Sequence, residues 1–465
     1  MAPKFGTSGL RGLVVELTPD LVDQYTRAFL ASCPTGGSVH IGWDLRPSSP
    51  DIAEAVITAV TRSGQTAIVD GVVPTPALAL ASLNAGHGAI MITGSHIPAD
   101  RNGLKFYTPE GEISKEHETA IMAHLTSPAP DAETPGARVD AGSAAQDAYA
   151  ARYVDAFGAH ALRGLRVGVY QHSSVARDIM VDVVEALGGE AIALARSDVF
   201  IPVDTEAVDP DTRAELSGWC TDNQLDALIS TDGDADRPMV ADKTGAIVPG
   251  DVLGALTARS LGAGIICTPV SSNTMIADMP EFETLHRTRI GSPYVIAAME
   301  DVIASNAQAP VVGYEANGGF LLGFDAQGPA GGLGPLMTRD CLLPMIAPLN
   351  MVATQGATLQ EVVANLPQRF TAADRVTGIE PEMSKPFLES LKSDASARVA
   401  FFADMGEEAN IDMTDGLRVT FKSGDIVHLR PSGNAPEFRC YTEAGTAERA
   451  QALLTSHMQK LANAF

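Results

Sequence analysis

The chain has 465 residues, which is too long for one hydrophobic core and predicts three or four domains. Charged residues make up 19% of the chain and hydrophobic residues 45%, a composition typical of a folded globular protein rather than a disordered one. The net charge of −25 argues against nucleic acid and anionic membranes as partners, because both are bound through an excess of Lys and Arg.

The cysteines are scattered and show no CxxC spacing, so we expect buried thiols rather than a zinc site or a disulfide framework. They are Cys33, Cys220, Cys267, Cys341 and Cys440. The first residues contain no apolar signal segment, and no stretch approaches the roughly 18 apolar residues of a membrane span. The expected location is therefore the cytoplasm, with no membrane partner.

The first part of the chain alternates helices and strands, which predicts an α/β unit. Helices are expected over 18–30 and 50–63, and strands over 39–43, 66–69 and 89–92. The stretch 128–143 is rich in Pro, Gly, Ala and Asp, lacks periodicity and is the expected linker. We therefore place the first domain at 1–140.

The loop after the strand over 89–92 contains Ser95 and His96 between Gly and Pro residues, with Lys105 shortly beyond. Loops that follow buried strands are where α/β proteins carry reactive groups. The sequence therefore makes Ser95 a candidate nucleophile. The alternative is an inert turn in which Ser95 bonds only to the local backbone.

The second part repeats the alternation, and we place a second domain at 141–249. Its strands are expected over 165–170, 191–195 and 227–229, a helix over 178–187, and a short hairpin over 238–248.

An acidic loop follows the last of these strands and places Asp232, Asp234 and Asp236 at alternate positions beside Arg237. Carboxylates that converge on a tight turn offer hard oxygen ligands, which suit Mg²⁺. A calmodulin-type calcium loop does not fit, because Arg237 stands where that loop needs Gly and Lys243 where it needs Glu. A solvated acidic turn is the alternative.

A third α/β domain is expected at 250–366, with strands over 264–268 and 311–314 and a helix over 335–346. Glu315 and Asn317 follow one of these strands at alternate positions. In an extended conformation both side chains would face one side, as binding of vicinal sugar hydroxyls requires. The alternative is a plain hairpin turn with Glu315 exposed.

The remaining residues, 367–465, read as a smaller α+β domain with strands over 416–421 and 425–430 and a closing helix over 446–463. Between the second strand and that helix, Arg430 and Arg439 flank a Gly/Ser/Asn turn. Such a turn exposes backbone N–H groups, and with two arginines it makes a positive anion site. A surface turn with two solvated arginines is the alternative.

Three further motifs accompany these four loops: Phe5-Gly6-Thr7-Ser8-Gly9-Leu10-Arg11-Gly12, Gly42-Trp43-Asp44-Leu45-Arg46-Pro47-Ser48-Ser49 and Pro74-Thr75-Pro76. In this order, and over the whole chain, the set resembles the α-D-phosphohexomutase family, the phosphoglucomutase/phosphomannomutase group. The resemblance implies an α/β fold of three related α/β mixed-sheet domains plus a C-terminal α+β domain around a central cleft. It also implies interconversion of hexose 1-phosphate and hexose 6-phosphate through a phosphoserine and a 1,6-bisphosphate.

The same resemblance implies roles for single residues. Ser95 would carry the phosphoryl group, with His96 beside it. Arg11, Lys105 and Arg237 would line the reaction centre, Lys105 as candidate general acid/base. Mg²⁺ would be held by phosphorylated Ser95, Asp232, Asp234 and Asp236. The implied substrate-binding residues are Glu315, Asn317, Gly291, Ser292, Arg430, Ser432, Gly433, Asn434 and Arg439.

The resemblance further implies a hexose phosphate as substrate, a hexose 1,6-bisphosphate as activator, and a monomer or homodimer. Two positions depart from the family's pattern: Ile97 stands where the serine loop usually has Asn, and Gly319 stands where the sugar loop often has His. The second departure leaves Lys105 with more of the proton transfer.

Three other functions stay open from the sequence. The E-x-N-G form of the sugar loop also resembles the N-acetylglucosamine or glucosamine phosphate mutase branch. Ile97 and Gly319 would also suit a weakly active sugar-phosphate-binding protein. A phosphatase with Asp232 as nucleophile is the third, although it would leave the serine and sugar loops unexplained.

Overall fold

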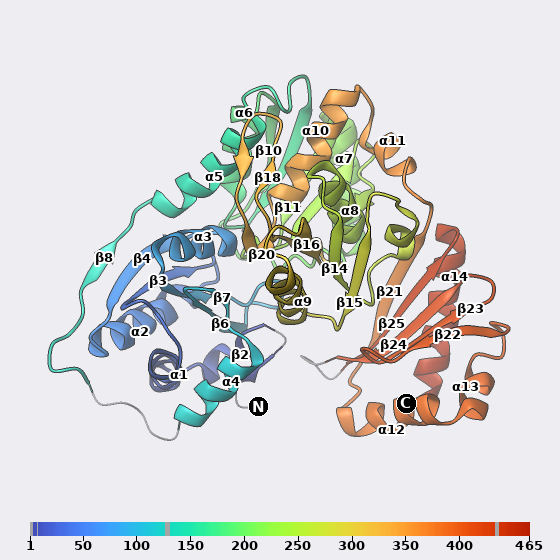
Figure 1. The fold of residues 1–465 in the computed structure, drawn as a ribbon, viewed down its shortest axis with the longest axis horizontal. Helices are drawn as coiled ribbons and strands as arrows, with labels where there is room; N and C mark the ends of the chain where they lie inside the picture. The colour runs from blue at the N-terminus through green and yellow to red at the C-terminus, as the bar shows by residue number, and fades with distance from the viewer. Residues whose placement is uncertain (1–2, 7, 126–130, 433–436) are drawn as a thin grey trace.

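The computed structural model describes residues 3–6, 8–125, 131–432 and 437–465. The described chain forms four main sheets and one two-stranded sheet. In Figure 1 the first sheet lies at the left and the fourth at the right, and the second and third lie between them. The expected architecture of three mixed-sheet α/β domains and a C-terminal α+β domain is confirmed.

The first sheet has the order β1-β2-β6-β5-β3-β4-β8, with β7 paired to β6. β3 is parallel to β4 and β5, whereas β6 runs antiparallel to β5 and β2. Its strands are β1 Lys4–Phe5, β2 Leu10–Leu13, β3 Ser38–Trp43, β4 Thr66–Val72, β5 Gly88–Ile92, β6 Arg101–Thr108, β7 Gly111–Glu112 and β8 Arg138–Asp140. Its helices are η1 Val14–Glu16, α1 Pro19–Ser32, α2 Ser49–Arg62, α3 Thr75–Ala85 and α4 Lys115–His124.

The second sheet has the order β10-β9-β11-β12-β13, parallel from β10 to β11 and antiparallel beyond. Its strands are β9 Arg166–His172, β10 Glu190–Arg196, β11 Ala227–Thr231, β12 Pro238–Asp242 and β13 Ile247–Val248. The helices are α5 Ala144–Phe157, α6 Arg177–Ala186 and α7 Pro210–Asp222. The acidic loop therefore follows a central strand.

The third sheet has the order β15-β14-β16-β17-β20. Its strands are β14 Ile265–Pro269, β15 Thr284–Thr288, β16 Val311–Tyr314, β17 Phe320–Leu322 and β20 Leu336–Asp340, and β18 Ala326–Gln327 pairs with β19 Gly332–Leu333 beside it. The helices are α8 Gly250–Ser260, η2 Thr274–Asp278, α9 Ser292–Ser305, α10 Leu343–Gln355 and α11 Leu359–Ala364.

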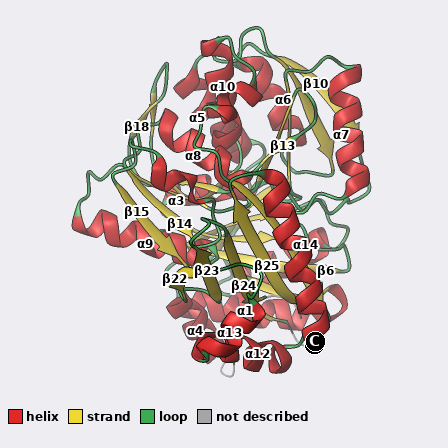
Figure 2. Ribbon diagram, turned by 90° about the vertical axis from the view of Figure 1, so that its right-hand side faces the viewer, coloured by secondary structure: helices red, strands yellow, loops and turns green. Residues whose placement is uncertain are grey.

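The fourth sheet is antiparallel throughout, in the order β21-β25-β24-β23-β22. Its strands are β21 Phe370–Thr377, β22 Glu408–Asp412, β23 Leu417–Phe421, β24 Ile426–Pro431 and β25 Glu437–Ala444. The helices are α12 Pro381–Ser393, α13 Ala395–Phe401 and α14 Ala447–Ala464. α14 packs along β21 and β25, as Figure 2 shows.

Part of the expected linker is a strand. Within 128–143, β8 pairs in parallel with β4 and extends the first sheet, although all three of its residues are exposed. Exposed edge strands carry no apolar alternation, so periodicity could not reveal this one. Residues 126–130 lie outside the described chain.

The helix expected over 335–346 is wrong. β20 occupies its first half and pairs with β17, and α10 begins only at Leu343. Asp340 separates the two elements, because its carboxylate accepts the backbone N–H of Leu342 at 3.0 Å. Pro344 in the first turn of α10 fits this later start, since proline is favoured there.

One apolar cluster runs through the first three domains, and each of these domains also packs a smaller separate cluster. One cluster of buried side chains joins α3, α5, α6, α8 and α10, whereas the fourth sheet packs a cluster of its own with α12 and α14. All five cysteines are free and buried, as expected. None of the described helices is long and apolar enough to cross a membrane.

A buried polar cluster ties the helix after the linker to the third sheet. The hydroxyl of Tyr149 on α5 donates to Asp340 Oδ1 at 2.6 Å, and the hydroxyl of Tyr153 donates to the other oxygen of the same carboxylate. All three residues are at most 2% exposed. Burial raises the pKa of Asp340, so this carboxyl group relies on the two donors for its stability.

Replacing one donor should therefore destabilise the fold. Tyr149→Phe leaves one oxygen of a buried carboxyl group with fewer donors, and we expect the free energy of unfolding to fall by about 1–3 kcal/mol. Urea unfolding followed by circular dichroism measures it. Arg196→Ala is the control, because its pair with Asp178 is exposed and should contribute less than about 1 kcal/mol. Equal losses for both variants would contradict the role of the cluster.

Candidate active site

The acidic loop forms a tight turn after β11. The backbone N–H of Asp232 bonds to the carbonyl of Arg237 at 3.2 Å, and Ala235 adopts φ +57°. The carboxylates of Asp232, Asp234 and Asp236 are at most 1% exposed, and one oxygen of each lies within 4.8 Å of the others. The predicted convergence is confirmed, and the solvated acidic turn is excluded by burial.

The three carboxylates fit a metal ion. Oδ1 of Asp234 and Oδ1 of Asp236 are buried and accept no hydrogen bond within the described residues. Buried carboxylate oxygens without donors are costly unless a cation satisfies them. An all-oxygen donor set is that of a hard divalent ion, so the triad could hold one.

Lys105 supplies part of the opposing charge. It lies on β6 of the first sheet, and its Nζ is 2.6 Å from Asp234 Oδ2 and 2.5 Å from Asp236 Oδ2. Burial alone would raise the pKa of Asp234, but the Lys105 ammonium holds that pKa below its ordinary value. Burial and the two neighbouring carboxylates raise the pKa of Asp232. The triad is therefore a strongly coupled set of charges.

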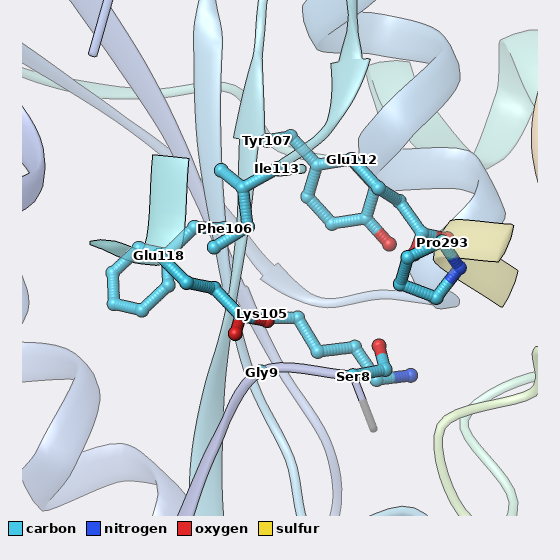
Figure 3. Close-up of a pocket in the computed structure, with 9 residues that line it drawn as sticks. All are labelled: Ser8, Gly9, Lys105, Phe106, Tyr107, Glu112, Ile113, Glu118 and Pro293. Atoms are coloured by element: carbon cyan, nitrogen blue, oxygen red, sulfur yellow. The ribbon is translucent and has the colours of Figure 1, made fainter. Parts of the chain in front are cut away.

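The approach to Lys105 is narrow. A cavity of about 10 Å³ lies between Lys105, Ser8 and Gly9 on one side and Tyr107, Glu112 and Pro293 on the other. Figure 3 shows Lys105 extending toward Ser8, and Tyr107 and Glu112 pointing toward Pro293 of the third domain. This small cavity therefore lies at the junction of the first and third domains, beside Lys105.

Ser95 touches the acidic loop. Its hydroxyl donates to Asp232 Oδ2 at 2.6 Å, and its Oγ lies 3.3 Å from His96 Nδ1. The residue has φ +53°, a conformation that costs a non-glycine residue roughly 1–3 kcal/mol unless its surroundings impose it. The serine bonds across domains rather than only to its local backbone, so it is not an inert turn residue.

Arg46 imposes that conformation. Its guanidinium is buried and donates to the carbonyls of Ser95 at 2.8 Å, Ile97 at 2.6 Å, Pro98 at 2.7 Å and Arg101 at 2.9 Å. Arg46 was part of a sequence motif, but no role could be predicted for it. One rigid, planar donor therefore fixes both ends of the serine loop.

Gly94 and Phe200 complete this clamp. A side chain at Gly94 would place its Cβ 2.5 Å from the Arg46 Cζ, so the loop needs glycine next to Ser95. The ring of Phe200, from the second domain, lies 4.2 Å from the same carbon. The cation is thus covered by an aromatic face on its remaining side.

His96 is held neutral by its surroundings. Burial and the nearby Arg237 guanidinium lower the pKa of His96 to about 3. Arg237 Nη1 lies 3.0 Å from His96 Nδ1 and donates to it, which leaves the proton of the neutral ring on Nε2. Arg237 Nε also lies 3.7 Å from Asp236 Oδ1, so this arginine contacts both loops.

Arg11 lies at the same centre. β2 pairs with β6 and sets Arg11 opposite Gly103, and Nη1 of Arg11 donates to the carbonyl of Thr93 at 2.7 Å. Burial lowers the pKa of Arg11 to about 10, and Asp234 opposes this shift. The structure therefore brings together Ser95 and every residue expected to line the reaction centre.

The expected sugar loop is a buried turn. Gly318 N–H bonds to the carbonyl of Glu315 at 2.9 Å and Gly318 adopts φ +87°, so the stretch is not extended. Asn317 Nδ2 still lies 3.5 Å from Glu315 Oε2. Glu315 is 4% exposed and Asn317 7%, so the alternative of an exposed Glu315 is wrong, although the hairpin turn it assumed is present.

Arg339 joins the acidic and sugar loops and was missed in the sequence. It lies on β20, with Nη2 at 2.7 Å from Asp236 Oδ2 and Nη1 at 3.4 Å from Glu315 Oε2. Burial opposes its charge, but Asp236 and Glu315 hold the pKa of Arg339 well above its ordinary value. Only as part of a strand over 336–340 does Arg339 reach the acidic loop, and the sequence predicted a helix there.

Two expected substrate residues lie between domains. Gly291 precedes α9 with φ +132°, and the Ser292 hydroxyl donates to Glu112 Oε2 of the first domain at 3.0 Å. Ile290 N–H donates to Asp415 Oδ2 of the fourth domain at 2.9 Å. This short segment of the third domain therefore contacts two other domains, the first and the fourth.

The expected anion loop contains partly neutralised arginines. Arg430 Nε lies 2.9 Å from Asp415 Oδ1, and Arg439 Nη2 lies 3.3 Å from Glu437 Oε2. Ser432 N–H donates to the carbonyl of Glu437 at 2.8 Å. Gly433 and Asn434 lie outside the described residues. The two arginines share neighbouring positions on β24 and β25, so a surface turn with freely solvated arginines does not describe them.

A second cavity, of about 370 Å³, lies between the second, third and fourth domains. Its lining includes Asp251, Ala316 and His428. Burial raises the pKa of Asp251 to about 7, and its Oδ1 has no hydrogen-bond partner within the described chain. The cavity therefore contains a carboxyl group that titrates near neutral pH.

Asp251 should make stability depend on pH. The pKa of Asp251 is about 7 in the folded chain, compared with its ordinary value of 3.8. Between pH 3.8 and pH 7 the folded state therefore keeps a proton that the unfolded state has lost. The stabilisation is complete below pH 4 and falls as the pH rises to 7, by at most about 1.4 kcal/mol per pH unit. As the pH rises from 4 to 7, Asp251→Asn should therefore gain stability relative to the parent.

Urea unfolding at several pH values measures this difference. Asp198→Asn is the control, because the Asp198 side chain is 95% exposed. The stability difference between parent and Asp251→Asn should change with pH, and that for Asp198→Asn should not. A constant difference for both variants would exclude a raised Asp251 pKa.

The clamp on the serine loop yields a further test. Arg46→Lys keeps the charge but cannot donate to all four carbonyls, so we expect a loss of about 2–4 kcal/mol in unfolding free energy. Amides over 93–101 should exchange with solvent at least about tenfold faster, measured by mass spectrometry. Arg62→Lys, at an exposed ion pair with Asp131, should change neither quantity. Unchanged exchange in Arg46→Lys would refute the clamp.

The chain matches all four domains of one family along its length. Phosphoglucomutase/phosphomannomutase alpha/beta/alpha domain I matches residues 2–131, domain II 147–245 and domain III 242–370, and the C-terminal domain matches 385–458.

Individual relatives agree with this assignment. A phosphomannomutase of Sinorhizobium fredii is 43% identical, with 99% of each chain covered. A phosphomannomutase of Salmonella muenchen is 41% identical over 96% of this chain and 93% of the relative. The crystal structure of a phosphoglucomutase/phosphomannomutase family protein from Burkholderia thailandensis has the same fold, with a TM-score of 0.77 at 21% identity over 98% and 96% of the two chains. The chain belongs to the phosphoglucomutase/phosphomannomutase family.

Proposed function

We propose that the protein is a phosphohexomutase that interconverts hexose 1-phosphate and hexose 6-phosphate, with mannose or glucose phosphate as substrate. Family membership and the two phosphomannomutases above 40% identity support this activity. The observation that carries it is the Ser95 hydroxyl, which donates to Asp232 Oδ2 at 2.6 Å at the edge of the carboxylate triad. A nucleophile beside a cation site is what phosphoryl transfer requires.

Ser95, in its phosphorylated form, would give its phosphoryl group to a hydroxyl of the bound sugar and form a hexose 1,6-bisphosphate. The bisphosphate would reorient and return its other phosphoryl group to Ser95 Oγ. A bisphosphate bound by a dephosphorylated chain would restore the phosphoserine, which makes it the expected activator.

The metal we assign to the triad is Mg²⁺, which would be held by Asp232, Asp234, Asp236 and an oxygen of the Ser95 phosphate. Bound there, it would neutralise charge on the transferring phosphoryl group. Arg237 would contribute a cation from the same loop. Its Nη1 donates to His96 Nδ1, which lies 3.3 Å from Ser95 Oγ.

Lys105 is the proposed carrier of the sugar hydroxyl's proton. Its ammonium lies between the first and second domains, against Asp234 and Asp236. His96 is less suited to donate a proton, because burial keeps the pKa of its imidazole at about 3. Arg11 would hold a phosphoryl oxygen in place.

The sugar would lie between the third and fourth domains. Glu315 and Asn317 supply acceptors and donors for two hydroxyls, and their adjacent placement in one buried turn supports this role. The proposed phosphate-binding residues are Arg430, Ser432, Gly433, Asn434 and Arg439, with Gly291 and Ser292 beside the sugar. Glu315 and Asn317 could bind two hydroxyls of the ligand in either of its two orientations.

Ser95→Ala should abolish the reaction. Intact-mass measurement of the parent should detect one phosphate, about 80 Da, and the variant should carry none, because the acceptor oxygen is absent. Turnover should fall by at least about 10⁴-fold. Ser393→Ala, on the exposed end of α12, is the matched control and should keep both mass shift and activity. A phosphorylated, active Ser95→Ala chain would refute the proposal.

A coupled assay identifies the substrate and separates the alternatives. Mannose, glucose, glucosamine and N-acetylglucosamine 1-phosphates are compared with Mg²⁺ and a hexose 1,6-bisphosphate present. Preference for the amino sugars would instead indicate the glucosamine branch, binding without turnover a sugar-phosphate-binding protein, and release of inorganic phosphate a phosphatase.

A further inference from the structure

The side chain of Arg339 packs directly against Gly319 and fills the space that a side chain at position 319 would need. A Cβ added to Gly319 would lie 2.7 Å from both Cγ and Cδ of Arg339 and 3.0 Å from its Cβ. Gly319 itself is not among the glycines with positive φ, so backbone conformation does not require glycine there. The arginine stem is therefore the reason that a side chain is excluded at position 319.

The excluded contact is with the part of Arg339 that cannot swing aside. Its Cβ and Cγ adjoin the backbone of β20, so any shift there would carry the guanidinium with it. That guanidinium is 2.7 Å from Asp236 and 3.4 Å from Glu315. A methyl group at Gly319 would thus disturb an ion pair on each of two loops.

The two carboxylates belong to different parts of the proposed reaction. Asp236 is in the metal triad beside Ser95, and Glu315 is in the sugar loop. Transfer needs the sugar oxygen within a few tenths of an ångström of its place before the phosphoryl group. A rigid guanidinium that donates to Glu315 and forms an ion pair with Asp236 fixes the distance between the two loops, which a flexible ammonium cannot do.

We infer that Arg339 is a positioning residue that sets the sugar loop against the metal loop, and that Gly319 is the space that admits it. The inference rests on the proposed mutase function, since it assigns the sugar loop its role. It predicts that the two residues act as one unit. A substitution at either position should disturb the same thing, the placement of the sugar loop against the metal loop.

The neighbours of Arg339 on β20 make its placement firm. Thr338 donates to Glu112 of the first domain at 2.9 Å, and Asp340 is held by the two tyrosines of α5. The residues on either side of Arg339 are thus fixed to other domains. A guanidinium on such a strand has little freedom, which suits a spacer between loops.

A double-mutant cycle tests the unit. The four proteins are the parent, Gly319→Ala, Arg339→Ala and the double variant, assayed with the best hexose 1-phosphate. We expect kcat to fall about tenfold or more in Gly319→Ala and about a hundredfold in Arg339→Ala, with KM changed less than about fivefold. The double variant should be little worse than Arg339→Ala, because the added methyl then no longer meets Cγ and Cδ and keeps only the 3.0 Å contact with Cβ.

Arg339→Lys separates positioning from charge or packing. Lysine keeps the charge and most of the stem, so the thermal unfolding midpoint should stay close to that of the parent. The kcat of Arg339→Lys should nevertheless be at least about tenfold below that of the parent. Mg²⁺ binding by calorimetry should be retained in Arg339→Ala, since the triad itself is intact. Full activity in Arg339→Lys, or multiplying losses in the cycle, would overturn the inference.

Two matched controls guard against general loss of stability. Arg398→Ala removes another buried arginine paired with a carboxylate, Glu408, in the fourth domain. Gly168→Ala adds a methyl 2.4 Å from Leu225 Cδ1 in the second sheet. Both should lower the unfolding midpoint with little change in kcat, and their effects should be independent of Arg339. Losses of kcat equal to those of the site variants would overturn the positioning role.

The outcomes also separate this inference from the proposed function. If the parent converts no hexose phosphate, the mutase function fails. The unfolding midpoints of the same four proteins still report whether Gly319→Ala destabilises only when Arg339 is present. Additive midpoint shifts would reject the shared space even in an active enzyme.

Discussion

Carboxylates buried together repel one another, and the site depends on how that charge is balanced. Asp232, Asp234 and Asp236 lie in one turn at the end of β11. Hydroxyl groups donate to two of them, Ser95 to Asp232 and Thr75 to Asp234, and nearby cations oppose the remaining charge. Lys105 reaches the triad from the first sheet and Arg339 from the third. Because the balancing charges come from different sheets, no single domain could form this centre alone. The site is therefore complete only when the three domains are packed together.

Much of the fold and the core of the site are local patterns, and such patterns can be read from a sequence. Apolar runs followed by Gly-, Pro- and Asp-rich loops predicted most of the strands, and β16 begins and ends where the run over 311–314 does. The convergence of Asp232, Asp234 and Asp236 is also local, because alternate residues of one tight turn must lie close together. Ser95 was found for a similar reason, through its loop rather than through its partners.

Contacts between distant segments could not be predicted in this way. The run over 336–340 is apolar at its start and charged at its end, and only pairing with β17 makes it a strand, so Arg339 was hidden in an expected helix. Arg46 was visible as a motif residue, but its carbonyl partners lie about fifty residues away in the chain. The pairing of Arg430 with Asp415 likewise could not be predicted, because no sequence pattern near either residue indicates it.

The separate core of the fourth sheet has a consequence for how easily the fourth domain can separate from the third. Its contacts with the third domain are polar: Thr274 N–H meets Glu443 at 3.1 Å, Arg289 meets the Thr414 carbonyl at 3.3 Å, and Ile290 N–H meets Asp415 at 2.9 Å. Water can replace such contacts at small net cost, whereas parting the first three domains would expose a continuous apolar surface. Separating the fourth domain from the third should therefore cost less free energy than separating the first three domains, and it would change the distance between Arg430 and Ser95.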